Sequence, residues 1–381
     1  MKIFIYTIGM LPGTERLMPW RTLIEVAKVM KNHGYDVMIL SGEKGINTRI
    51  YQNINIVSCS TDLTEISLYI QNEKPDVLFF PISRRDGLKN LNPLSTISCH
   101  KVAYVPGGVY PNDGVIKLLM VAGKNARSYI LDNLTSYRLL TRKLSAITCD
   151  RIITLTEYTR KKFIKSGWDK QKIKTILPGK DDFNNIEPDE VFLEKKGLTN
   201  SKYYLFMGAP APIRGSIQLL NSFEEFANNT NNGKLVMCMR TDNSSDYSFF
   251  NSALNKSKSK NKISVITDKL DPQQLRTILK NAHAVILPFI LIPSEIPLTY
   301  FEVLSCGIPI ITYKNGGTYD YLQSCVLAAK GRSRKSLTNK MIQLWDDQNL
   351  WNKLSNNALA LMSKHPTWEE VGKLWIKEIE Q

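Results

Sequence analysis

The sequence predicts an α/β protein with parallel sheets, divided into two domains. Short apolar runs of strand length alternate with amphipathic segments of helical spacing along most of the 381 residues, which is typical of βαβ units. A chain of this length exceeds what one hydrophobic core usually serves and suits two domains of ordinary size. The composition, 43% hydrophobic and 22% charged, is that of a globular protein and excludes a disordered chain.

Each expected strand is a short run rich in β-branched, aromatic or other apolar residues and bounded by turn signals. In the first half we expect strands over 2–8, 36–40, 55–57, 77–80, 101–105 and 151–155. In the second half we expect them over 203–207, 234–239, 263–267, 284–287 and 309–312. The amphipathic run 20–32, which Gly34 follows, predicts a helix between the first two strands.

The domain boundary is expected between Pro178 and Asn200, where charge and glycine are dense and the periodicity is lost. This gives a first domain over 1–180, a linker over 181–199 and a second domain over 200–365. The run 2–8 is needed as a strand and no small-residue cleavage site follows it, so we do not expect a signal peptide. No run approaches the roughly 18 to 20 apolar residues of a membrane-spanning helix.

The stretch 284–313 is the most informative part of the chain for function. It predicts a buried strand, a loop, a helix over about 298–305 with Ser294 as its N-cap, a turn at Gly307 and a second strand. A helix N-terminus at the carboxyl end of a parallel strand favours anions. Glu302, one turn further in, could accept hydrogen bonds from two ribose hydroxyls. The alternative is an ordinary βαβ unit of any doubly wound protein.

A second stretch, 203–216, predicts a strand that runs into a glycine-bounded loop. Gly208 and Gly215 flank the loop, and Arg214 precedes the second glycine. A nucleoside diphosphate needs a nearby cation and a glycine that lets the backbone approach it. The alternative is an arginine that merely solvates a turn.

These stretches resemble the donor-site signature of the GT-B glycosyltransferases, specifically the retaining family four, also called glycosyl transferases group 1. SEIPLTYFEVLSCGIPII (294–311) aligns without gaps with E-G-F-P-x-x-x-L-E-A-M-A-x-G-x-P-V-I, and Glu302 takes the ribose-binding position. The two glycines of 203–216 match G-R-x-x-x-x-K-G, and Arg214 takes the lysine position. The fold implied is the GT-B architecture: two Rossmann-like doubly wound parallel-sheet domains facing across a cleft.

Weaker similarities cover the rest of the chain. The opening 1–42 resembles the family's first strand, loop and helix, with the loop of Gly13 reaching toward the donor. The stretch 150–181 resembles the segment before the hinge. TWEEV (367–371) resembles the start of the family's last helix, which implies that a helix over about 366–381 packs back on the first domain.

The chain departs from the family pattern at three places. The first family glutamate falls on Ser294, with Glu295 one residue late, and the first family arginine is Ala209. Pro106 and Gly107 stand where the family often has a histidine that contacts the donor sugar.

The resemblance implies a metal-independent hexosyltransferase that moves a sugar from a nucleoside diphosphate sugar to a hydroxyl with retention, with the acceptor on the first domain. The implied enzyme needs no cofactor besides the nucleoside diphosphate sugar, which is its co-substrate. The implied catalytic residues are Arg214, Glu302 and Glu295. The implied donor-binding residues are Gly13, Gly107, Gly208, Gly215, Ser294, Pro297, Leu298, Thr299, Gly316 and Gly317. A GT-B subunit that binds nucleotide sugar or glycan without catalysis, and a GT-B sugar-nucleotide epimerase, are the alternatives.

Charge is concentrated in the first half of the chain. The net charge is +15, and residues 1–180 hold +13 of it, with 27 Lys and Arg against 14 Asp and Glu. The basic amphipathic stretches 116–122 and 137–147 suit an anionic membrane surface. A solvated basic face is the alternative, and nucleic acid is disfavoured because no recognised binding motif accompanies the charge. We therefore expect a cytoplasmic protein, peripheral on the inner face of the cell membrane, with a lipid-linked glycan acceptor in bacterial surface polysaccharide or lipopolysaccharide synthesis.

Cysteine and histidine usage points to a reducing compartment and away from a metal site. The six cysteines show no paired spacing, and several lie in or beside apolar runs, as buried thiols do. The four histidines show no metal-ligand spacing, so no metal is expected.

Overall fold

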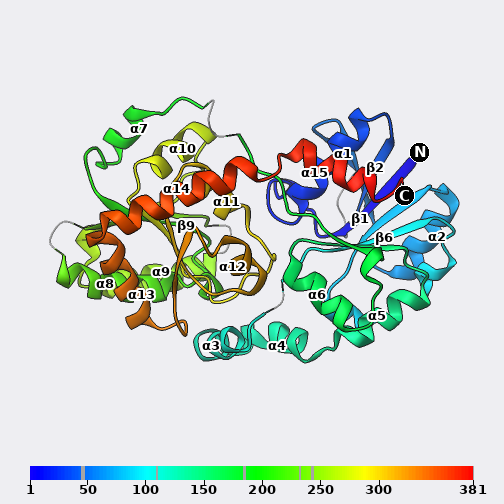
Figure 1. Ribbon diagram of the computed structural model, residues 1–381, viewed down its shortest axis with the longest axis horizontal. Coiled ribbons are helices and arrows are strands. Elements are labelled where there is room, and N and C mark those ends of the chain that lie inside the picture. Colours follow the sequence, from blue (N-terminus) through cyan, green and yellow to red (C-terminus); the bar gives the residue numbers. More distant parts are fainter. Residues whose placement is uncertain (44–47, 109, 183–185, 231–232, 242–243, 381) are drawn as a thin grey trace.

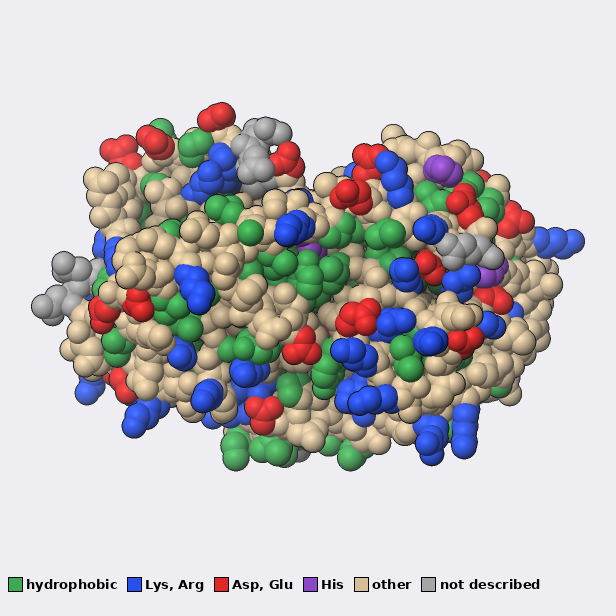
Figure 2. Space-filling model, viewed as in Figure 1, with side chains coloured by type: hydrophobic (Ala, Val, Ile, Leu, Met, Phe, Trp, Pro, Cys, Tyr) green, Lys and Arg blue, Asp and Glu red, His purple; other side chains and the backbone are tan. Residues whose placement is uncertain are grey.

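The computed structural model describes the chain except residues 44–47, 109, 183–185, 231–232, 242–243 and 381. Two α/β lobes lie side by side, each with a sheet between layers of helices (Figure 1). The two-domain, doubly wound fold class predicted from the sequence is confirmed. Figure 2 shows the surface of the same view, with Lys and Arg spread over both lobes and apolar side chains along the lower edge.

The first sheet has the strand order β3-β4-β2-β1-β5-β6-β7-β8. Its pairs are parallel except β3 with β4. The strands are β1 Lys2–Ile8, β2 Asp36–Gly42, β3 Arg49–Tyr51, β4 Ile54–Cys59, β5 Val77–Pro81, β6 His100–Val105, β7 Arg151–Thr154 and β8 Ile173–Thr175. The central β1 pairs with β2 along its whole length, from Lys2 opposite Asp36 to Ile8 opposite Gly42.

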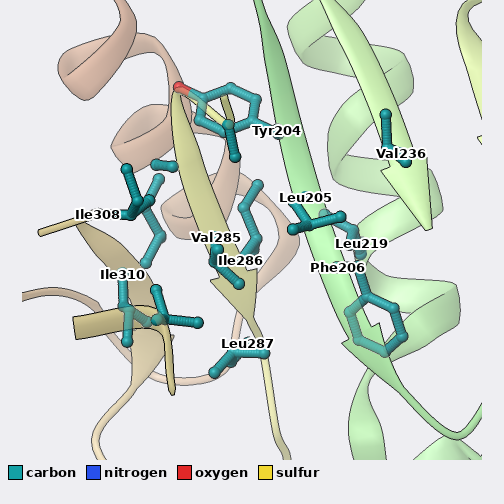
Figure 3. Packing of buried hydrophobic residues seen from close by; sticks show 14 of the residues in the cluster. Tyr204, Leu205, Phe206, Leu219, Val236, Val285, Ile286, Leu287, Ile308 and Ile310 are labelled. Carbon is teal, nitrogen blue, oxygen red and sulfur yellow. The ribbon is translucent and has the colours of Figure 1, made fainter. Parts of the chain in front are cut away.

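The second sheet has the order β11-β10-β9-β12-β13-β14, and all its pairs are parallel. The strands are β9 Tyr203–Gly208, β10 Lys234–Met239, β11 Ile263–Ile266, β12 Ala284–Leu287, β13 Ile310–Tyr313 and β14 Val326–Ala329. Figure 3 shows how Leu205, Phe206 and Ile286 fill the space between this sheet and its helices. Burial on both faces explains why these strands read as continuous apolar runs.

Helices cover both faces of each sheet (Figure 1). Those of the first domain are α1 Trp20–Asn32, α2 Leu63–Glu73, α3 Asn112–Ala122, α4 Arg127–Leu134, α5 Tyr137–Ala146 and α6 Glu157–Lys165. Later helices are α7 Glu190–Lys195, α8 Ser216–Asn229, α9 Ser244–Lys256, α10 Pro272–Lys280, α11 Leu298–Ser305, α12 Gly316–Leu322, α13 Arg334–Asp346, α14 Gln348–Lys364 and α15 Trp368–Lys377. Two 3-10 turns matter below, η3 Gly123–Ala126 and η5 Pro212–Arg214. Among the described residues, no helix is both long enough and apolar enough to cross a membrane.

The last helix, α15, lies on the first domain, so both chain ends are in that lobe (Figure 1). Trp375 is buried in the first domain's core, with its ring centroid 5.1 Å from that of Phe79. Gly372 makes the close packing on α1 possible, since a Cβ there would lie 2.3 Å from the Cβ of Val29. Thr367 and Glu370 form a capping box that fixes where α15 begins.

The expected strands all form, with ends that differ by at most two residues from the predicted ones. The strands β3, β8 and β14 were not predicted. They have three or four residues each, and none is buried along its whole length, so they give no apolar run of strand type. The helix α7 lies inside the stretch that the sequence marks as a linker.

Candidate functional site

The candidate site lies where the carboxyl ends of strands from the two sheets face each other, the usual ligand position in doubly wound sheets. The second domain contributes the loops after β9, β12 and β13, and the first domain those after β1, β6 and β7. An isolated bridge joins Gly107 to Ser294, and the Gly108 N–H donates to the Pro293 carbonyl at 3.1 Å. The loop after β6 of the first sheet therefore contacts the loop after β12 of the second sheet.

The loop between Gly208 and Gly215 turns tightly because of its two glycines. Gly208 ends β9 with φ +149°, and Gly215 has φ +72° where α8 begins. A Cβ on Gly215 would lie 2.0 Å from the Pro288 carbonyl oxygen, so no side chain fits there. This approach brings η5, and Arg214 with it, against the loop after β12.

Arg214 is a half-buried cation with no ion-pair or hydrogen-bond partner in the described part of the chain. Its guanidinium carbon lies 4.7 Å from the ring centroid of Phe289, which holds the group by a cation–π contact. Burial and the neighbouring Arg240 lower its pKa to about 10, so it stays charged at neutral pH. A guanidinium whose donors lack a protein acceptor suits an anionic ligand.

Arg240 is a second cation that the sequence analysis missed. It directly follows β10, its backbone N–H donates to the Gly208 carbonyl at 3.3 Å, and its side chain is exposed. Arg240 thus lies next to Gly208, where the loop that carries Arg214 begins, and its charge helps to lower the pKa of Arg214. The signal that could have found it is Ala209, because a missing cation at that position calls for another at a neighbouring strand end.

Glu302 lies in the second turn of α11 and is half-buried. Among the described residues it has no hydrogen-bond or ion-pair partner. Its pKa is raised to about 7, mainly by burial and also by the nearby carboxylate of Asp181. The positive charges of Arg21, Arg16 and Arg240 act in the opposite direction. Asp181 is itself held by Arg21 at 2.8 Å. A carboxylate without a partner remains available to hydroxyl groups of a ligand.

The N-terminus of α11 is open. Its N-cap is Pro297, with φ −68° and ψ 136°, and no side chain caps the helix. The prediction of Ser294 as the N-cap is therefore wrong, because the bridge to Gly107 holds Ser294 three residues before the N-cap. The first N–H groups of α11, those of Leu298 and Thr299, have no carbonyl in the preceding turn to bond. The Ser294 Oγ is also buried without a partner in the described structure.

Glu295 makes an interdomain contact that its sequence position did not predict. Its side chain is buried, and one carboxylate oxygen accepts hydrogen bonds from the hydroxyls of Thr156 and Thr159, at the start of α6. Burial raises its pKa to about 7, although the two threonine hydrogen bonds act in the other direction. The second carboxylate oxygen is buried with no partner among the described residues. The Glu295 carboxyl group therefore bonds residues of the first domain, although Glu295 itself belongs to the second.

The space around Glu295 is nearly full. The cavity between the domains here has about 10 Å³, room for about one water, and is lined by Gly108, Tyr110, Asn315, Gly317 and Glu295 among others. A Cβ on Gly317 would lie 2.3 Å from the Thr156 Oγ1. Gly316 opens α12 with φ +39°. A sugar cannot fit between Gly107, Gly317 and Ser294 unless the domains part.

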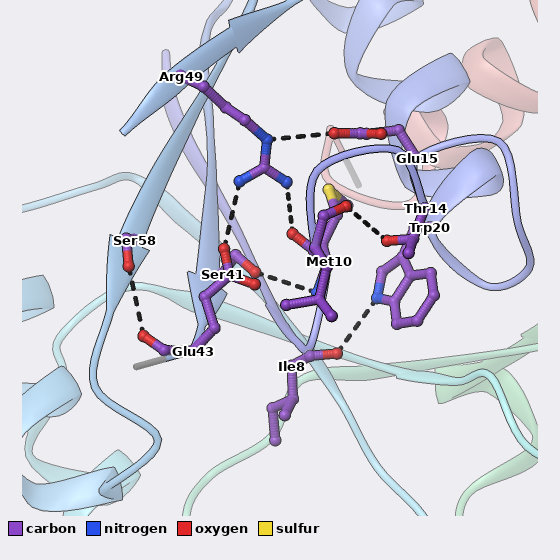
Figure 4. Close-up of polar contacts among 10 residues, drawn as sticks. Ile8, Met10, Thr14, Glu15, Trp20, Ser41, Glu43, Arg49 and Ser58 are labelled. Atoms are coloured by element: carbon purple, nitrogen blue, oxygen red, sulfur yellow. Dashed lines mark hydrogen bonds and ion pairs between the residues drawn. The ribbon is translucent and has the colours of Figure 1, made fainter. Parts of the chain in front are cut away.

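The loop with Gly13 follows β1 and is held by a buried ion-pair network (Figure 4). The Arg49 guanidinium lies 3.1 Å from a carboxylate oxygen of Glu15 and 3.2 Å from one of Glu43, and it also donates to the Met10 carbonyl. Gly13 itself is exposed, with φ +86° and no atom within 4 Å of where a Cβ would be. The network fixes the base of the loop and leaves Gly13 open to solvent.

No histidine among the described residues is bonded to Arg214, Glu302 or Glu295, although the ring of His365 packs against Phe301 of α11, with centroids 4.1 Å apart. The rings of His283 and His365 bond backbone carbonyls of Leu344 and Pro178. His100 opens β6, at the far end of the strand from Gly107, and His33 ends α1. No group of three or more His, Cys, Asp or Glu side chains gathers as a metal site in the described ranges.

Glu295→Gln tests the interdomain contact. The folded pKa of Glu295 lies above its unfolded value, so ionisation costs stability, and that cost grows as pH rises from about 4.5 to about 7 and then stays constant. Glutamine keeps the threonine contacts through its amide oxygen but never ionises. The melting temperature of the variant minus that of the wild type should therefore increase between pH 5 and pH 8.

Glu370→Gln is the control with the opposite sign, because hydrogen bonds from Thr367 lower the pKa of Glu370. This variant should be less stable than the wild type above the unfolded pKa, and the deficit should disappear as pH falls below it. A melting-temperature difference for Glu295→Gln that does not change with pH would show that the carboxyl is not buried as described.

Comparison with known proteins shows which family model and which solved structures this chain resembles. Residues 189–360, somewhat less than half of the chain, match the family described as glycosyl transferases group 1. No curated protein sequence matches the chain. A glycosyltransferase from Rickettsia africae is similar over 100% of this chain and 97% of its own, with a TM-score of 0.72 at 14% identity.

Two further solved structures extend the similarity. Sucrose-phosphate synthase from Thermosynechococcus elongatus has a TM-score of 0.77 at 12% identity over 100% and 98% of the two chains. HepE from Anabaena, in complex with UDP and glucose, has a TM-score of 0.71 at 12% identity over the whole of both. The chain therefore has the GT-B fold, and residues 189–360, which include most of its second domain, match the model of the glycosyl transferases group 1 family.

Proposed function

We propose that this protein is a retaining glycosyltransferase that moves a sugar, of hexose type, from a nucleoside diphosphate sugar to a hydroxyl acceptor. The observation that carries the proposal is the arrangement of Arg214, Glu302 and the open N-terminus of α11 in a glycosyl transferases group 1 domain. All three have unused hydrogen-bonding capacity in the described structure, and they match the anionic and hydroxyl groups of such a donor.

The chemistry follows from where charge develops. As the glycosidic bond breaks, negative charge grows on the leaving phosphate. Arg214 and the N–H groups of Leu298 and Thr299 would stabilise this charge more in the transition state than in the ground state. Arg240 would supply the second cation that Ala209 does not. Glu302 would hold the ribose hydroxyls and so orient the nucleotide.

The proposed donor is supported by the structures that resemble this chain. HepE was determined with UDP, with UDP-glucose and with UDP and glucose. Two arginines beside an open helix N-terminus can balance a diphosphate, so the proposal requires no metal and no resident cofactor. Because no described histidine lies at the site, the departing phosphate itself is the group proposed to take the acceptor proton, on the same face of the sugar.

The acceptor is proposed to be a lipid-linked glycan bound by the first domain, in bacterial surface polysaccharide or lipopolysaccharide synthesis at the inner face of the cell membrane. The support is the basic excess of residues 1–180, which suits an anionic surface. Because the interdomain cavity holds about one water, the donor is proposed to bind when the domains separate near Glu295.

A subunit that binds nucleotide sugar without transferring it is a second candidate. The observation in its favour is that Glu295 contacts the first domain and Ala209 replaces a cation. Binding is common to both candidates, whereas release of a nucleoside diphosphate in the presence of an acceptor belongs to the transferase alone. An epimerase would need histidines at the site, and the described ones lie elsewhere.

Arg214→Met tests the proposal after a thermal-shift screen of nucleotides and nucleotide sugars, with and without EDTA, has found the donor. A donor at a hundred times its Kd should stabilise the protein by about 2.7 kcal/mol. We expect Arg214→Met to lower kcat by roughly a hundredfold to a thousandfold, the usual effect of losing one preorganised donor. Turnover is measured as nucleoside diphosphate released.

Arg334→Met is the matched control, because Arg334 is exposed on α13 and pairs with Glu225. It should leave both binding and turnover unchanged. Full turnover by Arg214→Met, or a shift with none of the nucleotides, would refute the proposed site. Binding without turnover would favour the second candidate.

The pH dependence of donor binding tests Glu302. Its pKa of about 7 means that the carboxylate, the better acceptor for ribose hydroxyls, forms as pH rises through neutrality. The affinity for the nucleotide sugar should therefore increase between pH 6 and pH 8, by up to about tenfold. A nucleotide sugar is used because it lacks the terminal phosphate group that titrates near pH 6.

In Glu302→Gln this increase should be lost, whereas Glu370→Gln, which removes a carboxylate of lowered pKa on α15, should keep it. An unchanged pH dependence in Glu302→Gln, measured by calorimetry, would remove Glu302 from the ribose site.

A further inference from the structure

Helices α3 and α4, with η3 between them, form an insertion between β6 and α5 that lies along the lower edge of the molecule (Figure 1). Its inner side is fixed to the second domain. Arg332, which is buried, pairs with Asp113 and donates to the Ile290 carbonyl at 2.9 Å. Val115 and Leu118 pack against Leu291. The insertion is therefore part of the interdomain contact.

The outer side of the same insertion is apolar and has no partner. Ile116, Leu119 and Met120 follow one another at helical spacing on α3, and Leu131 and Leu134 do so on α4. Their exposed fractions lie between 46% and 77%. We call these five side chains the outer apolar face. In Figure 2 apolar side chains line this lower edge.

A helix that is apolar on both sides is expected to be buried on both. The outer apolar face is thus an interaction surface that the chain itself leaves uncovered, because contiguous exposed apolar groups mark binding sites in soluble proteins.

The charged side chains of the insertion and of α5 indicate which kind of partner the outer apolar face would bind. Both acids of α3 and α4 are neutralised within the protein, Asp113 by Arg332 and Asp132 by Arg85. The exposed Arg127, Arg138 and Arg142 have no ion-pair partner in the described part of the chain. The insertion and the helix α5 that follows it therefore expose apolar side chains together with unpaired arginines, a combination that is complementary to an anionic lipid layer.

We propose that the outer apolar face docks on an anionic membrane surface, with Met120 and Leu134 entering the interface between headgroups and acyl chains and the three arginines contacting lipid headgroups. This assigns membrane contact to a particular face of the first domain, and it does not depend on sugar transfer. Where the proposed function holds, it also brings lipid near the candidate site, since Tyr129 on α4 and Ile213, the neighbour of Arg214, pack against the same apolar cluster.

The test is co-sedimentation of the full chain with vesicles, without nucleotide or acceptor, so that its failure is distinct from a failure of sugar transfer. Vesicles of phosphatidylcholine alone are compared with vesicles that also contain phosphatidylglycerol. We expect partition to the anionic vesicles, weakened by salt. Met120→Asp combined with Leu134→Asp should reduce partition by roughly tenfold or more. Each of Arg127→Gln, Arg138→Gln and Arg142→Gln should reduce it about fivefold.

Leu68→Asp is the matched control, because Leu68 on α2 is 56% exposed in the same domain and lies outside the outer apolar face. It should partition like the wild type. Melting curves of all variants check that they are folded.

Three outcomes would overturn the proposal. The first is no partition of the wild type, and the second is partition that the Met120 and Leu134 substitutions leave unchanged. The third is a dimer in light scattering that those substitutions dissociate, because the face would then contact a second copy of the chain.

Discussion

The contact of Glu295 with Thr156 and Thr159 joins the two domains at the point where a donor sugar would have to lie. Two threonine hydroxyls donate to one oxygen of the buried carboxyl group and offset part of the cost of its burial, while the other oxygen has no partner among the described residues. The bridge from Gly107 to Ser294 and the packing of Gly317 on Thr156 depend on the same closure. In the described structure the two domains thus contact each other at this point. Separation of the domains would replace these contacts with contacts to water or to a ligand.

Among the described residues, the three groups with unused hydrogen-bonding capacity that the proposal assigns to the donor lie on the second domain. Arg214, Glu302 and the N-terminus of α11 are positioned by tight backbone contacts, such as that of Gly215 with Pro288, and not by side-chain bonds of their own. Such a site is preorganised, because the loops are fixed before any ligand arrives. In the proposed reaction, domain closure would exclude water, and the two arginines would balance the diphosphate in place of a metal.

The sequence predicted those features that follow from local pattern. The strands, the bounds of α1 and α11, and the places of Arg214 and Glu302 depend on apolar periodicity and glycine positions within a few residues. What it could not predict depends on distant pairs. The partners of Glu295 lie more than a hundred residues earlier, and Arg240 reaches Gly208 only because β10 pairs with β9. The N-cap was misassigned for the same reason, since Ser294 is fixed by Gly107 of the other domain.

The most direct test of the account is a crystal structure of the complex with the nucleotide sugar that stabilises the protein. The account predicts the diphosphate between Arg214 and Arg240 at the N-terminus of α11, the ribose hydroxyls on Glu302, and the domains further apart at Glu295 than in the state described. A nucleotide bound elsewhere, or one whose ribose does not contact Glu302, would contradict the central claim.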